Sequence, residues 1–145
     1  MTSWEDLTRQ LAAVLAEFVD SGRLIISAIQ PPGVYVQAAQ DDAELLVEAV
    51  ADRYLPVGSR IGADGDERMR GLGWKPEGDF ENWAHTLTWP AASSEYKRAA
   101  GMMVGALRDV YGVPDPTALT YKAWNDLDTP PELELSELGI TRATD

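Results

Sequence analysis

The stretch LIISAIQPPGVYVQAAQ, residues 24–40, decides how the chain folds. Its first half is rich in isoleucine, and its second half, from Val34 onward, alternates small apolar side chains with larger or polar ones. Alternation with a period of two is typical of a strand with one buried face. The Pro-Pro-Gly between the halves suits a tight connection, because proline fixes φ and glycine tolerates positive φ. We therefore predict a hairpin with strands over residues 24–30 and 34–40.

Two long amphipathic helices are predicted on either side of this hairpin in the sequence. Apolar residues recur at intervals of three and four over residues 4–19, and Gly22 suits the backbone just after a helix. The same spacing occurs over residues 96–111, before Gly112 and Pro114. Helices with one apolar stripe beside antiparallel strands predict an α+β fold, in which both helices pack on the sheet.

Residues 81–89 form the most aromatic of the predicted strands. They place Trp83, His85, Leu87 and Trp89 at period two, so that two indoles and the single histidine share one face. The second face of this strand carries smaller and polar side chains, so the aromatic face could stay partly open. The segment therefore serves either the core or a surface for a partner.

Shorter patterns predict the remaining elements. Residues 64–72 read as a short helix, and residues 119–124 alternate as a strand does. Residues 41–56 are ambiguous, because their alanine, leucine and glutamate favour a helix, while their parity also fits a strand with one apolar face.

Composition excludes several classes of partner. The 145 residues suit one compact domain, and 24 acidic against 12 basic residues give a formal net charge of −12. This field repels phosphate, so we expect no nucleic acid and no anionic membrane as partner, and a basic or unstructured polypeptide fits better. The alternative interpretation is that the excess of acidic residues only keeps the protein soluble. The chain has no cysteine, no signal-like N-terminus and no apolar run of the about 20 residues that span a bilayer, so we expect a cytoplasmic protein.

The sequence contains no set of residues typical of an active site. His85 is the only histidine and there is no cysteine, so no local spacing supports a zinc site or a thiol nucleophile. Asp64-x-Asp66 begins like a calcium loop, but Met69 stands where glycine is required. The sequence does not test catalysis by a pair of carboxylates that only the fold brings together. We predict no catalytic, cofactor-binding or metal-binding residue, and no enzymatic activity.

The aromatic residues instead suggest a surface for a partner. Indole and phenol rings suit cores and interfaces alike, because a large apolar body ends in a polar group. Core packing is the simpler interpretation for each ring, but two helix stripes already supply much of a core. We expect Trp74 to be buried, and we predict four residues that contact a partner. These are Trp83, Trp89, Tyr35 and Trp124.

Several short motifs keep a fixed order along the chain. They are Tyr35-Val36-Gln37, Glu48-Ala49-Val50, Arg53-Tyr54-Leu55, Leu72-Gly73-Trp74, Asn82-Trp83, Trp89-Pro90 and Leu119-Thr120-Tyr121. In this order, over residues 4–124, the chain resembles the actinobacterial TY-Chap proteins, which are grouped with type III secretion chaperones and YbjN-like proteins. The resemblance implies an α+β fold, with an N-terminal helix and a second long helix packed on an antiparallel sheet of about four to five strands. It also implies that residues 45–55 form a strand.

The resemblance further implies a chaperone-like module that holds an extended client polypeptide, with a secreted protein as one candidate. Relatives in the broader group often dimerise, so a homodimer stays open. We expect one domain over residues 1–125 and an acidic C-terminal tail, disordered or loosely attached, over residues 126–145. Two alternatives remain: a small-molecule-binding or enzymatic α+β domain with a pocket near His85, and an immunity protein that blocks a toxin through its acidic surface.

Overall fold

The computed structural model describes residues 2–76 and 82–143 and contains a seven-stranded sheet. The strand order is β4-β5-β3-β2-β1-β6-β7, and all neighbouring strands are antiparallel except β6 and β7. The strands are β1 (Gly22–Ala28), β2 (Tyr35–Gln40), β3 (Glu44–Ala49), β4 (Lys75–Pro76), β5 (Trp83–Thr88), β6 (Leu119–Asn125) and β7 (Thr141–Arg142). The helices are α1 (Trp4–Glu17), α2 (Gly62–Leu72) and α3 (Ser93–Gly105), with short helical turns η1 (Asp52–Tyr54), η2 (Val57–Ser59), η3 (Ala106–Val110), η4 (Pro116–Ala118) and η5 (Ser136–Leu138).

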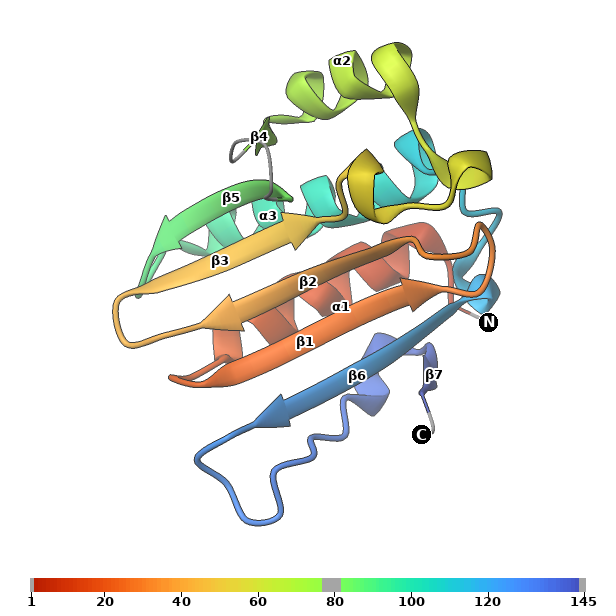
Figure 1. Cartoon of the computed structure of the whole chain (residues 1–145). Helices are drawn as coiled ribbons and strands as arrows, with labels where there is room; N and C mark the ends of the chain where they lie inside the picture. Colours follow the sequence, from red (N-terminus) through yellow and green to blue (C-terminus); the bar gives the residue numbers. More distant parts are fainter. Residues whose placement is uncertain (1, 77–81, 144–145) are drawn as a thin grey trace.

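Helices α1 and α3 cover one face of the sheet, and Figure 1 shows both behind the strands, with α2 above β4. Their apolar stripes face the strands, so the core lies between the helices and the sheet. Fully buried core residues include Leu7, Leu11, Leu15, Leu24, Ile26, Leu45, Val47, Met103 and Leu107. The predicted α+β class is thus confirmed. Within the described residues no helix has both the length and the apolar character needed to cross a membrane.

The sheet has more strands than the four to five that were predicted. The additional strands β4 and β7 contain two residues each. Two residues are too few to produce a periodic pattern in the sequence, so these strands arise only from contacts made in the folded chain.

Several predicted strands differ from the observed ones at their ends. The strand predicted over residues 24–30 is β1, which runs from Gly22 to Ala28. The ambiguous segment does form a strand, β3, as the resemblance implies, but the strand ends at Ala49 rather than at Leu55. Residues 52–54 instead form the turn η1. The predicted aromatic strand is β5, which begins at Trp83, while Glu81 lies outside the described residues.

The acidic C-terminal segment packs against the rest of the chain as far as it is described, to residue 143. Leu138 is 0% exposed and Ile140 is 9% exposed, and the N–H of Ala143 donates to the carbonyl of Tyr121 at 2.7 Å. These contacts differ from the disordered or loosely attached tail that was expected. The reason is that a few regularly placed aliphatic residues are buried while the acids between them face solvent. The division of the chain after residue 125 stays a prediction.

Candidate functional site

The face of the sheet opposite α1 and α3 presents side chains from β3, β2, β1 and β6, and we call this surface the open face. It is turned toward the viewer in Figure 1. Cross-strand pairing places two rows on it: Leu46, Ala39, Arg23 and Trp124, and next to them Glu48, Gln37, Ile25 and Lys122. The alternate residues of the same strands, such as Leu24 and Ile26, point to the helices and are fully buried.

The open face combines apolar and polar groups. Ile25, Leu46 and Trp124 are half-buried, so each keeps part of its apolar surface in contact with solvent. Between them, the side-chain amide of Gln37 donates to the carboxylate of Glu48 at 3.1 Å. A surface with apolar side chains around a fixed polar pair can accept a further layer of polypeptide.

Trp124 lies beside a pocket of about 370 Å³ at the β6 end of the open face. The pocket is lined by Ile25, Lys122, Ala123, Trp124, Pro131 and Glu132. Its volume is near the lower limit of ligand pockets, about 300–1,000 Å³, and suits a few side chains better than a cofactor. Lys122 and Glu132 place one charge of each sign at its rim, so a bound segment would meet an apolar wall with a polar border.

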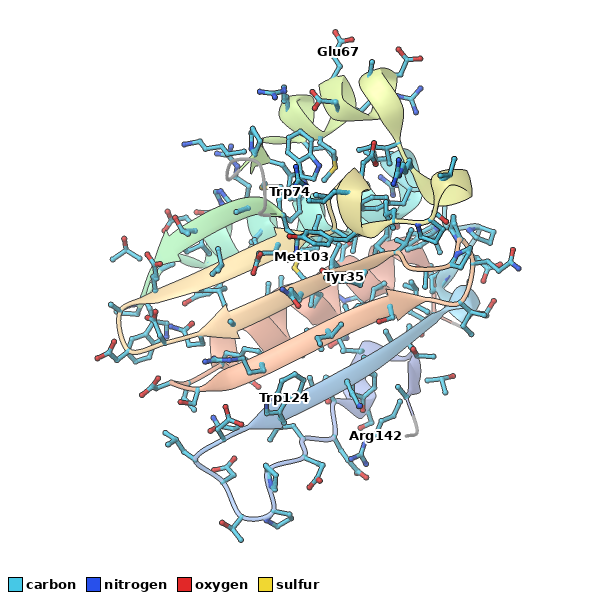
Figure 2. All side chains as sticks on the ribbon, in the orientation of Figure 1. Tyr35, Glu67, Trp74, Met103, Trp124 and Arg142 are labelled. Atoms are coloured by element: carbon cyan, nitrogen blue, oxygen red, sulfur yellow. The ribbon has the colours of Figure 1, made fainter. Side chains whose placement is uncertain are left out.

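Tyr35 belongs to the same face, at the start of β2, and Figure 2 labels it together with Trp124. Its hydroxyl accepts a hydrogen bond from the side-chain amide of Asn82 at 3.0 Å, which fixes the ring toward β5. Tyr35 precedes Ala39, which shares a row with Trp124, by four residues, or about 13 Å along the strand direction. An extended peptide of about five residues could therefore reach both rings.

Two of the remaining tryptophans belong to the core. Trp83 pairs with Ala49 on the face toward the helices and is 6% exposed, with the guanidinium of Arg70 at 5.6 Å from its ring centre. The prediction that Trp83 contacts a partner is therefore corrected, whereas His85 and Trp89 on the same face are half-buried. Trp74 is 2% exposed, as predicted, and its indole N–H donates to the carbonyl of Met102 at 3.3 Å.

Trp89 follows β5 and is half-buried, and its backbone N–H donates to the carbonyl of Ala43 at 2.8 Å. In the described part of the chain, β4 pairs with only the first two residues of β5. Because backbone groups of alternate residues point to opposite sides of a strand, Thr86 and Thr88 direct theirs to this edge. Such an edge can accept a strand from a second chain.

His85 lies half-buried on the helix-facing side of β5. Burial lowers the pKa of its imidazole, and the nearby charges of Arg98 and Lys75 lower this pKa further, against a weaker effect of Glu95. Burial and these two cations therefore favour the neutral form of the ring. Over residues 2–76 and 82–143, no group of three or more histidines and carboxylates is placed to hold a metal ion.

A larger hollow of about 470 Å³ lies between α1 and α3, on the side away from the sheet. Its lining includes Ala12, Gly101 and Val104, and charged residues such as Arg9 and Lys97 surround them. The backbone groups of a helix are bonded within the helix, so this groove has no main-chain partners for an extended peptide. The edges of the sheet do offer such partners, and the open face offers side-chain contacts beside them.

The sequence reasoning missed Ile25, Leu46 and Lys122 as members of this site. A signal for Ile25 was present, because Arg23, Ile25 and Ser27 form the less apolar parity of their strand. No local pattern could show that Leu46 and Lys122 lie in line with it, since their positions depend on the register of strands that are distant in the sequence.

Comparison with known proteins identifies a related family. The family model TY-Chap3, described as T3SS (YopN, CesT) and YbjN peptide-binding chaperone 3, matches residues 1–125. The matched region runs from before α1 to the end of β6. No curated protein matches the chain, and no solved structure matches it either.

Proposed function

The chain belongs to the TY-Chap3 family, and we propose that it is a non-enzymatic, chaperone-like module that holds a client polypeptide in extended form. The observation that supports the proposal most directly is the open face, where Trp124 and Tyr35 are half-buried on a sheet that leaves one side free of α1 and α3. We include secreted proteins among the candidate clients. The proposal assigns contact to these two rings first and to Trp89 second.

The binding mechanism follows from the geometry of the site. A bound segment would place one side chain in the pocket beside Trp124 and lie across β1 and β2 toward Tyr35. Apolar contact with the indole and the phenol would select the side chains, and any main-chain pairing would come from a sheet edge. The contacts spread over several residues suit extended segments of variable sequence.

The charge of the protein affects which clients arrive fastest. With a formal net charge of −12, the surface attracts basic segments and speeds their encounter. Because this attraction acts between exposed groups, it weakens as salt is added. The burial of apolar side chains at the open face is less sensitive to salt, so a client should retain most of its affinity at high ionic strength.

The proposal is tested with short random peptides displayed on phage and selected on the immobilised full-length chain. Selected peptides, labelled with a dye, should bind the wild type, and Trp124→Ala and Tyr35→Ala should each weaken binding by about tenfold or more, which is about 1.4 kcal/mol. Val57→Ser is the matched control, because Val57 is 79% exposed and lies on η2. Its affinity should equal that of the wild type.

Four outcomes would contradict the proposal. Selection could return no peptide above background, or the selected peptides could bind Trp124→Ala and Tyr35→Ala as tightly as the wild type. An immunity protein would instead bind one folded toxin, with an association rate that falls steeply with salt. An enzyme that uses His85 would show turnover that His85→Ala abolishes.

The proposal extends to location and assembly. We place the protein in the cytoplasm, in keeping with its lack of cysteine. If the chain forms a homodimer, the edge of β5 at Thr86 and Thr88 is the place where two copies would pair. Sedimentation of the wild type and of Thr86→Pro tests this, because proline removes the backbone donor that such pairing needs.

A further inference from the structure

Residues 126–135, which we call the strap, lie along the outer edge of β6. The N–H of Leu133 donates to the carbonyl of Ala123 at 2.9 Å, and Trp124 faces Glu132 in an antiparallel bridge. The strap thus pairs with β6 as an added strand would, directly beside the pocket at Trp124. The chain itself shows that this edge accepts an extended polypeptide.

The strap does not fill its groove. Leu133 and Leu135 are half-buried and border a hollow of about 190 Å³, whose lining also includes Val14 and Phe18 from the end of α1. On the other side of the strap lies the pocket of about 370 Å³ beside Trp124. Atoms that line an unfilled space lose contacts, so larger apolar side chains than leucine would make better use of this groove.

Charge also disfavours the strap as an occupant. Residues 126–145 contain six of the 24 acids and one of the 12 bases, so they contribute −5 to the formal net charge and residues 1–125 contribute −7. Like charges repel at long range, so the C-terminal residues are held against this repulsion. The ion pair of Glu134 with Arg142, at 3.2 Å, joins two residues of the C-terminal part itself. A basic segment would be attracted where the strap is repelled.

Residues 136–143 hold the end of the chain in place through contacts of their own with the rest of the fold. Leu138 and Ile140 are buried, and Thr141 pairs with Thr120 where β7 joins β6. The strap connects this fixed part to β6 and has Leu127, at 70% exposure, in its first turn. It can therefore leave and return without detaching the end of the chain, and the tether keeps it at high local concentration.

We propose that the edge of β6 beside Trp124 is a client site, and that the strap occupies it in the free protein. The client that displaces the strap is an extended, basic segment with bulky apolar residues two positions apart, in place of Leu133 and Leu135. This inference rests on the proposed function, and it adds the edge that pairs with the client and the chemistry of the client. Until such a segment arrives, the strap covers an edge that would otherwise invite unwanted pairing.

Because the chain has no cysteine, engineered disulfides can test the inference in the full-length protein. Ala123→Cys with Leu133→Cys would join the strap to β6, since neighbouring strands hold Cα atoms about 5 Å apart, within the range of disulfides. Thr120→Cys with Thr141→Cys is the matched control, because it joins β7 to β6 and leaves the strap free. The probe is a dye-labelled peptide of the strap sequence with lysine for each aspartate and glutamate and phenylalanine for each leucine, so that it is basic and carries bulky apolar residues at the positions of Leu133 and Leu135.

Oxidation of the first pair should weaken probe binding by about tenfold or more, and a reducing agent should restore it, because a locked strap blocks the edge. The control pair should bind the probe equally in both oxidation states. In a chain without engineered cysteines, Leu133→Ser with Leu135→Ser should bind the probe more tightly than the wild type. A probe that binds the first pair equally when oxidised and reduced, or that does not bind the serine variant, would overturn the inference.

These results also separate this inference from the proposed function. Suppose that the disulfide between positions 123 and 133 has no effect on probe binding, while Trp124→Ala still weakens binding of the peptides selected on phage. The client then uses the open face, and the strap is a permanent part of the fold. If the selected peptides are insensitive to Trp124→Ala as well, the proposed function fails together with the inference.

Discussion

Replacing Leu138 with alanine tests whether the C-terminal residues belong to the fold. Leu138 is 0% exposed and lies on η5, which packs against α1. Removing a fully buried leucine side chain leaves a cavity and costs about 2–5 kcal/mol. Since a domain of this size is stable by about 5–15 kcal/mol, the substitution should remove a large share of the free energy of unfolding.

Equilibrium unfolding in urea, followed by tryptophan fluorescence, measures this loss. With a slope of about 2 kcal/mol per molar urea, the midpoint should fall by about 1–2.5 M. Thermal unfolding should show a decrease in Tm of about 4–20 °C, because each kcal/mol corresponds to roughly 2–4 °C for a chain of this length. The slope itself should be unchanged, since the rest of the structure stays folded.

Leu127→Ala provides the control within the same part of the chain. Leu127 is 70% exposed, so its replacement should change the free energy of unfolding by no more than about 0.5 kcal/mol. If Leu138→Ala shifts the midpoint no further than Leu127→Ala does, the C-terminal residues are not docked in solution, and the reasoning from burial fails.

Three further substitutions test individual contacts. Gly73→Ala should lower the free energy of unfolding by about 1 kcal/mol or more, because Gly73 has a φ of 107° and a Cβ there would lie 3.1 Å from a guanidinium nitrogen of Arg98. Gly71→Ala is the control, because its Cβ would meet nothing within 4 Å, and it should be neutral or stabilising in thermal unfolding. Burial lowers the pKa of His85 in the folded chain, so the unfolded chain binds the proton first as pH falls, and the free energy of unfolding decreases below about pH 6.5. His85→Gln should remove this decrease, which urea unfolding above and below that pH measures. Tyr111→Phe removes the hydroxyl that donates to the buried carbonyl of Val50 at 2.6 Å and should cost about 1–3 kcal/mol in the same assay.

The long elements could be predicted from the sequence because each contains enough residues to show its period. The apolar stripe of α1 repeats over several turns, and β2 alternates buried with half-buried positions along its whole length. Residues 44–49 were different, because their composition favours a helix, and only pairing with β2 and β5 makes them a strand. Here the resemblance to a family was more informative than local propensity.

The orientation of β5 could not be predicted, and this is why one predicted contact residue turned out to be buried. The sequence correctly places Trp83 and His85 on one face of a strand, but either face could have pointed to the helices. The register settles the choice, because Trp83 lies opposite Ala49 and His85 opposite Val47, both of which are fully buried. That register depends on pairing between residues more than thirty positions apart, which no local pattern contains.

The C-terminal residues were hard to interpret for a compositional reason. Six acids among residues 126–145 suggest a solvated tail, and they conceal the aliphatic residues that lie between them. The structure divides these residues by burial: Leu138 is fully buried, whereas Leu133 is only half-buried. Burial of apolar surface contributes roughly 25 cal/mol per Å², so the half-buried leucine is held by a smaller free energy than the buried one.

This difference in burial bears on how a sheet edge can be both protected and usable. A covering segment that is buried throughout would close the edge of β6 permanently, and a segment with no buried residue would leave the edge open to aggregation. In this chain the firmly held part, around Leu138, lies beyond the weakly held part, around Leu133. The second part can therefore exchange at low cost while the first keeps it nearby, so a client needs to exceed only the affinity of the strap and not the stability of the fold.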